Sequence, residues 1–373
     1  MNRSTKICFI GLQNLPVLAR EFNAHGIGGE EVQHTLLAKA LARRGYQVSM
    51  VVADYGQADG AEWCGVKTYK AYKPTDGLPG VRFFWPRWTG MWSALKRAGA
   101  DVYYVSCASF RVGLCALFAR FHNRRAVFRI ASDMDCEPGK LLIEYKYNYW
   151  RDRRLYEYGL RRMDGILAQS VHQQEALRRN YGLQSILAPM MVEAVESTAN
   201  FEDRANAVLW VSNIRQLKRP DLLIDLAESL PNLTVHMIGG PMANSEQLYE
   251  HVKRRASAVA NVVFHGQIPY HDVNEYFGSS RVFVNTSEIE GFPNSFLQAW
   301  ARGTPVVSFF DPDGVIASEG LGRTVSNLHE MKDAVNRFCN DADEWRAASK
   351  RCTSFMARRF DEEEILSTYI KVF

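Results

Sequence analysis

The chain has 373 residues, of which 47% are hydrophobic and 23% are charged. These proportions exclude a disordered or fibrous chain and indicate a globular protein of about two ordinary domains. We expect neither a membrane span nor a signal peptide, since no apolar run is long enough and the opening residues, MNRSTKICFIGL, soon give way to polar ones. The seven cysteines show no metal-ligand spacing, so we expect reduced thiols in a cytoplasmic protein.

The formal net charge of +4 is unevenly distributed. Residues 1–190 carry 27 basic and 16 acidic residues, and the remainder carries 18 basic and 25 acidic residues. A basic half favours an anionic partner, such as a phosphorylated acceptor or an anionic membrane surface. Because the second half is acidic, we expect no nucleic-acid groove along the whole chain.

Residues 1–190 are predicted to form a Rossmann-like unit. The apolar run 6–12 predicts a strand, and apolar residues at helical spacing predict a helix over 30–44 that Gly45 ends. Gly28 and Gly29 precede this helix, where glycines let the backbone pass close to a ligand. The dinucleotide fingerprint GxGxxG is absent, which disfavours a dehydrogenase. Further strands are predicted at 47–53, 102–105, 126–130, 163–170 and 185–188.

Two segments of the first half mix aromatic and basic residues. The segment 83–92 is too rich in Trp and Pro to predict a regular element, and 141–162 predicts a helix. Aromatics packed on the core with solvated arginines, contact with a membrane surface, and binding of single-stranded nucleic acid all fit this composition.

Residues 191–205 are polar and weakly patterned, which predicts a linker. A second Rossmann-like domain is predicted over 206–355, with a strand at 207–211 and a helix at 221–230. The loop between them contains Arg215 and Lys218, a fork and a point charge suited to an anion. Two later strands are predicted to end at Gly239 and just before the loop 266–269.

The most informative stretch is 281–307. An apolar strand at 281–285 is followed by the turn Gly291-Phe292-Pro293-Asn294 and by a helix whose apolar residues share one face. The unpaired N–H groups of such a helix start bind phosphate, and Asn294 or Ser295 is expected to cap it. Glu290 is unusual beside an anion, but its oxygens suit sugar hydroxyls, and a nucleotide sugar presents both groups.

This stretch resembles the donor-site signature of family 4 retaining glycosyltransferases, which have the GT-B fold. The resemblance rests on Glu290-Gly-Phe-Pro, on a polar residue eight positions later, and on Ala-x-Gly-x-Pro-Val-Val. It implies that Glu290 holds the donor sugar and that Gln298, where the family has Glu, holds the ribose. It also implies that Arg215 and Lys218 clamp the diphosphate at a spacing shorter than the family's, with Arg219 as an alternative partner.

The resemblance extends to other loops. Gly28 and Gly29 correspond to the family's glycine loop near the diphosphate and acceptor, and Gly239 and Ile268 fall in loops near the donor. In the family, a strand-end His precedes an Asp by three residues; here Asp133 matches the acid and Ile130 replaces the His. Asp133 is expected to contact the acceptor side. Capping of the next helix by Asp133 is the alternative, and Arg129, Ser132 or Asp135 are other replacements for the His.

The implied architecture is two Rossmann-like α/β domains facing across a cleft, with a C-terminal helix over 356–373 returning to the first domain. The implied reaction transfers a sugar, with retention, from a nucleotide-sugar donor to a glycan or polyprenyl-diphosphate-linked acceptor in cell-surface polysaccharide assembly. We expect no cofactor and no metal. The alternatives are a non-catalytic nucleotide-sugar-binding subunit of an assembly complex and a nucleotide-sugar epimerase.

Overall fold

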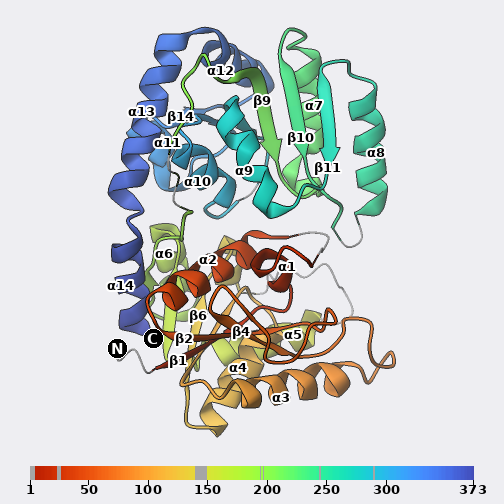
Figure 1. The fold of residues 1–373 in the computed structure, drawn as a ribbon, viewed down its shortest axis with the longest axis vertical. Helices are drawn as coiled ribbons and strands as arrows, with labels where there is room; N and C mark the ends of the chain where they lie inside the picture. Colours follow the sequence, from red (N-terminus) through yellow and green to blue (C-terminus); the bar gives the residue numbers. More distant parts are fainter. Residues whose placement is uncertain are drawn as a thin grey trace. The chain divides into compact units, whose positions relative to one another are not determined.

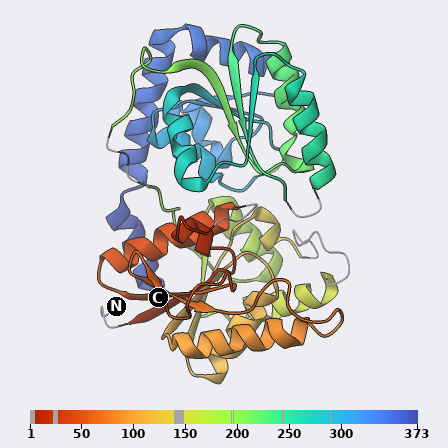
Figure 2. The same ribbon diagram turned by 45° about the vertical axis from the view of Figure 1, so that its right-hand side comes forward.

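A computed structural model describes residues 5–22, 27–138, 149–193, 195, 197–242, 245–288 and 290–373. They divide into two compact units, each shown in Figures 1 and 2. The first unit falls within residues 1–22, 29–191 and 362–373, and the second within 23–28 and 192–361. Residues 141–148, the first part of a predicted aromatic and basic helix, lie outside the described residues.

The described part of the first unit is built on an eight-stranded sheet in the order β3-β4-β2-β1-β5-β6-β7-β8. All neighbours are parallel except β3 and β4. The strands are β1 (Lys6–Ile10), β2 (Gln47–Val52), β3 (Glu62–Trp63), β4 (Val66–Lys70), β5 (Val102–Ser106), β6 (Arg125–Arg129), β7 (Gly165–Ala168) and β8 (Ile186–Leu187).

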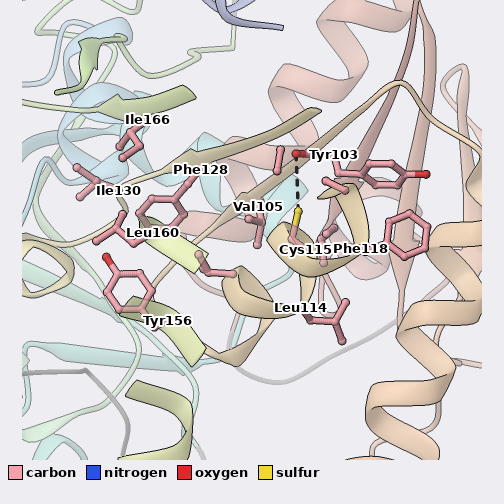
Figure 3. Close-up of a cluster of buried hydrophobic side chains, with 14 of the residues drawn as sticks. Tyr103, Val105, Leu114, Cys115, Phe118, Phe128, Ile130, Tyr156, Leu160 and Ile166 are labelled. Atoms are coloured by element: carbon pink, nitrogen blue, oxygen red, sulfur yellow. Dashed lines mark hydrogen bonds between the residues drawn. The ribbon is translucent and has the colours of Figure 1, made fainter. Parts of the chain in front are cut away.

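Helices cover both faces of this sheet, which is why its central strands are nearly continuous apolar runs. The helical segments are α1 (Leu15–Leu18), α2 (Gly29–Arg43), η1 (Phe83–Trp88), α3 (Thr89–Ala98), α4 (Phe110–Phe121), η2 (Asp133–Cys136), α5 (Tyr149–Leu160), α6 (Val171–Tyr181) and α14 (Glu362–Val372). In Figure 1, α2 lies on the opposite face of the sheet from α3 and α4. Between the sheet and α4 and α5, Tyr103, Phe118, Phe128 and Tyr156 form part of a closely packed core (Figure 3).

The C-terminal helix α14 packs in the first unit. Arg125 on β6 donates hydrogen bonds to the backbone oxygens of Val372 and Phe373, at 3.0 and 2.9 Å. The Tyr369 hydroxyl donates to the carbonyl of Pro189 at 3.2 Å. The chain enters this unit again at Glu362, six residues later than the start of the predicted returning helix.

The described part of the second unit is built on a six-stranded parallel sheet in the order β11-β10-β9-β12-β13-β14. Its strands are β9 (Ala205–Val211), β10 (Thr234–Ile238), β11 (Val262–Gly266), β12 (Ser280–Asn285), β13 (Val306–Ser308) and β14 (Gly322–Thr324). Its helical segments are η3 (Gln216–Lys218), α7 (Pro220–Glu228), α8 (Glu246–Ser257), α9 (Tyr270–Ser279), α10 (Asn294–Ala301), η4 (Pro312–Gly314), α11 (Val315–Glu319), α12 (Leu328–Asn340) and α13 (Ala342–Arg359).

Alternate residues of these strands face two helical layers. Val208 and Trp210 of β9 belong to a core cluster shared with α7, α8 and α12. On the other face, the ring of Phe283 lies 5.2 Å from that of Phe277 on α9 and 6.2 Å from that of Phe296 on α10. The two parallel α/β units confirm the predicted fold class.

One expected irregular segment is helical. Residues 83–88 form the π-helical segment η1, with extended backbone only at Trp85, and lead directly into α3. Phe83 is buried against Phe110 of α4, with ring centroids 5.3 Å apart. Tertiary packing of aromatic side chains therefore overrides the local preference that Pro86 and the tryptophans indicate.

Candidate functional site

The predicted donor residues gather at the point where the strand order of the second sheet reverses. β9 lies between β10 and β12, so the chain leaves β9 and β12 in opposite directions. Ligands of open parallel sheets bind at such a point, beside the carboxyl ends of the strands. The loop after β9 carries Arg215 and Lys218, and the loop after β12 carries Glu290.

Hydrogen bonds join these two loops into one structure. The backbone N–H of Glu288 donates to the carbonyl of Leu217 at 2.8 Å. Thr286 is fully buried: its hydroxyl donates to the Lys218 carbonyl at 2.7 Å and accepts from the Trp210 indole at 2.9 Å. Lys218 and the residues around Glu290 are thus held on a shared frame.

Lys218 and Glu290 meet directly at this frame. The Lys218 ammonium donates to Oε1 of Glu290, and the Ser287 hydroxyl donates to the same oxygen at 2.7 Å. The Lys218 and Glu290 side chains keep 15% and 16% of their surface exposed. A charged pair that is mostly buried yet still reachable can exchange its partners for the phosphate and hydroxyls of a ligand.

Arg219, the alternative partner for the diphosphate, contacts the loop after β12. Its Nε donates to the carbonyl of Thr286 at 2.7 Å and its Nη2 to that of Ser287 at 3.2 Å. Its guanidinium also lies 4.6 Å from the ring centre of Phe309. Arg219 therefore fixes the loop after β12, and Lys218 is the cation of this pair that faces Glu290.

The helix α10 begins differently from the prediction. Pro293 occupies the N-cap position, Asn294 and Ser295 are the first two helical residues, and no side chain caps the helix. Phe296 anchors the start, because its ring stacks on that of Phe310 at 5.3 Å. Gly291 and Phe292 lie in the turn that precedes the helix. The N-terminal end of α10 carries the positive end of the helix dipole, which favours an anion.

Gln298 on α10 belongs to a chain of side chains that sequence reasoning missed. Its Nε2 donates to Oδ1 of Asn274 on α9 at 3.0 Å, and Asn274 Nδ2 donates to Glu193 at 2.7 Å. Since its nitrogen is committed to Asn274, Gln298 can offer its Oε1 to a hydroxyl. No pattern in the sequence singled out Asn274, and Glu193 lay within the predicted linker.

The two remaining donor loops of this unit are tightly constrained. A Cβ added to Gly239 would lie 1.9 Å from the carbonyl oxygen of Ser212, so only glycine fits there. Ile268 follows β11 in the loop before α9. His236 and His265, which the sequence treats as separate structural residues, are partners, with Nδ1 and Nε2 3.0 Å apart. Burial lowers the pKa of both rings, which favours the neutral pair.

The structure places the other predicted residues at the start of α2 and after β6. Gly29 is the first residue of α2, whereas Gly28 groups with the second unit. Asp133 Oδ1 accepts from Gln173 Nε2 at 2.9 Å. Asp133 is not the helix cap: Ser132 is the N-cap of η2, and Asp135 completes the capping box. The acceptor-side role of Asp133 stays a prediction.

Comparison with solved structures identifies the class of fold. Sucrose-phosphate synthase from Thermosynechococcus elongatus superposes with a TM-score of 0.75 at 18% identity, over 99% of this chain and 98% of that one. Anabaena HepE, in complex with UDP and glucose, gives a TM-score of 0.75 at 16% identity over 98% of both chains. A Rickettsia africae glycosyltransferase gives 0.66 at 11% identity, over 100% of this chain and 98% of that one. The protein has the GT-B fold.

The sequence comparisons then define the family. The model described as "Glycosyltransferase Family 4" matches residues 27–188, and that described as "Glycosyl transferases group 1" matches residues 205–341. The chain belongs to the family 4, group 1 glycosyltransferases.

The curated relatives match only part of this chain. The O-antigen biosynthesis glycosyltransferase WbnH of Escherichia coli is 27% identical over 165 residues, 43% of this chain and 45% of that protein. The D-inositol 3-phosphate glycosyltransferase of Frankia alni is 34% identical over 112 residues, 27% of this chain and 28% of that protein. The matches thus span less than half the length of these relatives.

Proposed function

We propose that this protein transfers a sugar from a nucleotide-sugar donor to a glycan or lipid-diphosphate-linked acceptor, with retention of anomeric configuration. The observation that carries the proposal is the contact between Lys218 and Glu290 beside the start of α10. It brings a cation for a diphosphate, a carboxylate for sugar hydroxyls and the N-terminal end of a helix into one place. The resemblance of one region to an O-antigen glycosyltransferase supports an acceptor in polysaccharide assembly.

The proposed reaction depends on charge stabilisation. As the bond between the anomeric carbon and the donor phosphate breaks, negative charge grows on the β-phosphate, where Lys218, Arg215 and the first-turn N–H groups of α10 would stabilise it. Glu290 would hold the sugar hydroxyls, and Gln298 would accept from the ribose. We propose that this chemistry uses no metal and no cofactor.

Donor binding can be tested by thermal shift with UDP, GDP, ADP and their common sugar conjugates. UDP-glucose is the first donor to test, since the structural neighbour HepE was determined with it. We expect one conjugate to raise the melting temperature more than its bare diphosphate does, because a ligand at 100 times its Kd stabilises by about 2.7 kcal/mol. The additional shift should vanish in Glu290→Ala.

The thermal shift, together with an assay of donor turnover, separates the alternatives. A donor that binds but is never consumed, with any acceptor or with water, favours the non-catalytic binding subunit. Conversion of the donor to another nucleotide sugar favours the epimerase. The absence of a shift with every donor contradicts the proposal.

We also propose that the first unit binds the surface of an anionic membrane on the cytoplasmic side. Among the described residues, no helix is long and apolar enough to cross a bilayer. Five large apolar side chains of residues 78–85 and of the start of α5 are nevertheless exposed: Leu78, Val81, Phe84, Trp85 and Trp150 each have 54–72% of their surface exposed. Arginines accompany them: the Arg151 guanidinium lies 3.4 Å from the ring centre of Phe83, and that of Arg154 lies 3.8 Å from Trp150. Apolar side chains beside guanidinium groups fit acidic lipid headgroups.

Vesicle flotation tests this surface. The wild-type chain should float with phosphatidylcholine vesicles that contain phosphatidylglycerol more than with pure phosphatidylcholine. Phe84→Ser combined with Trp85→Ser should weaken binding about 10-fold or more, since burying one large apolar side chain contributes about 1.5–3 kcal/mol. Phe121→Ser is the matched control, because Phe121 is 77% exposed on α4. Equal binding by the double variant and the wild type would contradict the proposal.

A further inference from the structure

The first unit has its own point of reversing strand order, between β1 and β5. β1 pairs with β2 on one side and with β5 on the other, and all three strands are parallel. The chain leaving β1 runs to α2, and the chain leaving β5 runs to α4. The first turns of these two helices therefore flank the place where an open parallel sheet binds its ligand. They carry Glu30 and Arg111.

Glu30 and Arg111 form a mostly buried pair across this place. Arg111 Nη2 donates to Oε2 of Glu30 at 3.4 Å. The Arg111 side chain is 18% exposed and the Glu30 side chain is 11% exposed. Arg111 Nε donates to the Ser109 hydroxyl at 3.1 Å, which fixes the guanidinium on the loop after β5. The second carboxylate oxygen, Glu30 Oε1, is buried and has no hydrogen-bond partner among the described residues. A buried acceptor left unpaired is unfavourable, so it marks a place for a donor group from a ligand.

Asp135, another acid near Glu30, already accepts hydrogen bonds from the backbone. Asp135 Oδ2 accepts from the N–H groups of Ala131 and Ser132 at 2.9 and 3.1 Å, and its Oδ1 accepts from that of Ala108 at 3.4 Å. It thereby ties the loops after β5 and β6 together. In the loop after β5, Cys107 has a φ of 66°, a left-handed conformation that non-glycine residues rarely adopt. Such backbone strain persists where surrounding structure enforces it and is frequent at functional sites.

We propose that Glu30 is an acceptor-binding residue, whose Oε1 accepts a hydrogen bond from a sugar hydroxyl of the acceptor while Arg111 holds Oε2. This inference rests on the proposed glycosyltransferase function and adds a binding site in the first unit. The ligand class is a hydroxyl-rich, uncharged sugar, because a carboxylate paired with one arginine accepts hydroxyls and repels further acids.

The charge of Glu30 gives this role a pH dependence. Burial raises the pKa of Glu30 to about 7, Arg111 and the Cys107 thiol oppose the rise, and Glu31 and Asp135 add to it. Tyr104 on β5 also lies close enough to interact with Glu30, and burial lowers the pKa of His34, one turn along α2. Only the ionised carboxylate accepts at both oxygens, so acceptor use should rise as the pH passes upward through about 7.

The test uses the full chain, the donor identified by thermal shift, and two kinds of acceptor. The acceptors are water and a panel of monosaccharides linked through diphosphate to a short alkyl chain. In Glu30→Gln, kcat/KM for the sugar acceptor should fall about 100-fold and lose its rise near neutral pH, while donor hydrolysis should change by less than about threefold. Glu31→Gln, on the same helical turn, is the matched control and should leave both rates unchanged at pH values well above 7, where Glu30 is ionised in both proteins.

The outcomes distinguish this inference from the proposed function. A wild-type chain that binds and consumes no donor contradicts the proposed function. If donor turnover is present, wild-type-like transfer by Glu30→Gln overturns the inference, as does loss of the donor-induced thermal shift in that variant. A wild-type chain that hydrolyses its donor but uses no member of the panel overturns the stated ligand class. If Glu30→Gln does not fold, Glu30→Asp should show weakened transfer with the pH rise retained.

Discussion

Lys218→Ala is expected to lower the rate of sugar transfer by about 10²–10³-fold, the usual effect of removing one group that stabilises a developing oxyanion. The side chain is mostly buried, and the structure holds its ammonium against Glu290 and Ser287. On donor binding the ammonium would contact the diphosphate, and Glu290 would turn to the sugar hydroxyls. Steady-state kinetics should show the loss in kcat, since the charge that Lys218 stabilises develops only during bond cleavage.

A double-mutant cycle sharpens this test. Lys218→Ala removes the partner of Glu290, so adding Glu290→Gln should cost less than it does in the wild type. Lys218→Arg should not restore the rate, because a planar guanidinium does not replace a compact ammonium in a partly buried contact. Lys253, an exposed residue of α8, provides the control substitution Lys253→Ala. Wild-type kcat in Lys218→Ala would rule out the catalytic role.

Arg204→Met is expected to produce the largest loss of stability. The guanidinium donates to the carbonyls of Phe277, Ser280 and Arg302 and to the Thr304 hydroxyl, and the residue is 3% exposed. Burial lowers the pKa of Arg204 to about 10, as expected for a cation with no nearby carboxylate to favour its charge. Each buried acceptor that loses its donor costs about 1–3 kcal/mol, so we expect a total of roughly 3–5 kcal/mol.

Calorimetry and hydrogen exchange measure this loss. The melting temperature should fall, and amide protection should decrease in β12 and α9, which carry the orphaned carbonyls. Arg346→Met is the control, because Arg346 is 50% exposed and solvent screens its ion pairs with Glu202 and Asp343. Equal melting temperatures for the two variants would contradict the stabilising role of the Arg204 hydrogen bonds.

The fold was predictable because its strands and helix ends are marked by residues that lie close together in the sequence. The central parallel strands are continuous apolar runs, and glycines such as Gly45 and Gly182, both with positive φ, end helices where the pattern stops. The turn before α10 was equally clear, since Gly291 and Pro293 follow an apolar strand. These features depend on residues close together in the sequence, and one sequence shows them directly.

The site was predictable only in part, because its contacts are long-range. Proximity in sequence made Arg219 as plausible a clamp as Lys218, and only the carbonyls of the loop after β12, about 67 residues later, decide between them. Arg204 sat at the end of a polar stretch and was placed in the linker, although five backbone or side-chain oxygens surround it. Glu30 looked like an ordinary acid in a first helical turn.

The hydrogen-bonded side chains of Gln298, Asn274 and Glu193 give a structural reason for glutamine at position 298, where the family signature has glutamate. Asn274 has one amide nitrogen, and Glu193 already takes it, so Asn274 presents its oxygen to Gln298. A glutamate at 298 would face that oxygen with no proton to donate. Gln298 therefore fits this network better than a glutamate would, because it supplies the proton that Asn274 Oδ1 accepts. Position 298 is thus coupled through Asn274 to the segment before β9, so Gln298→Glu would break a hydrogen bond between two helices while every other residue of the signature stayed in place.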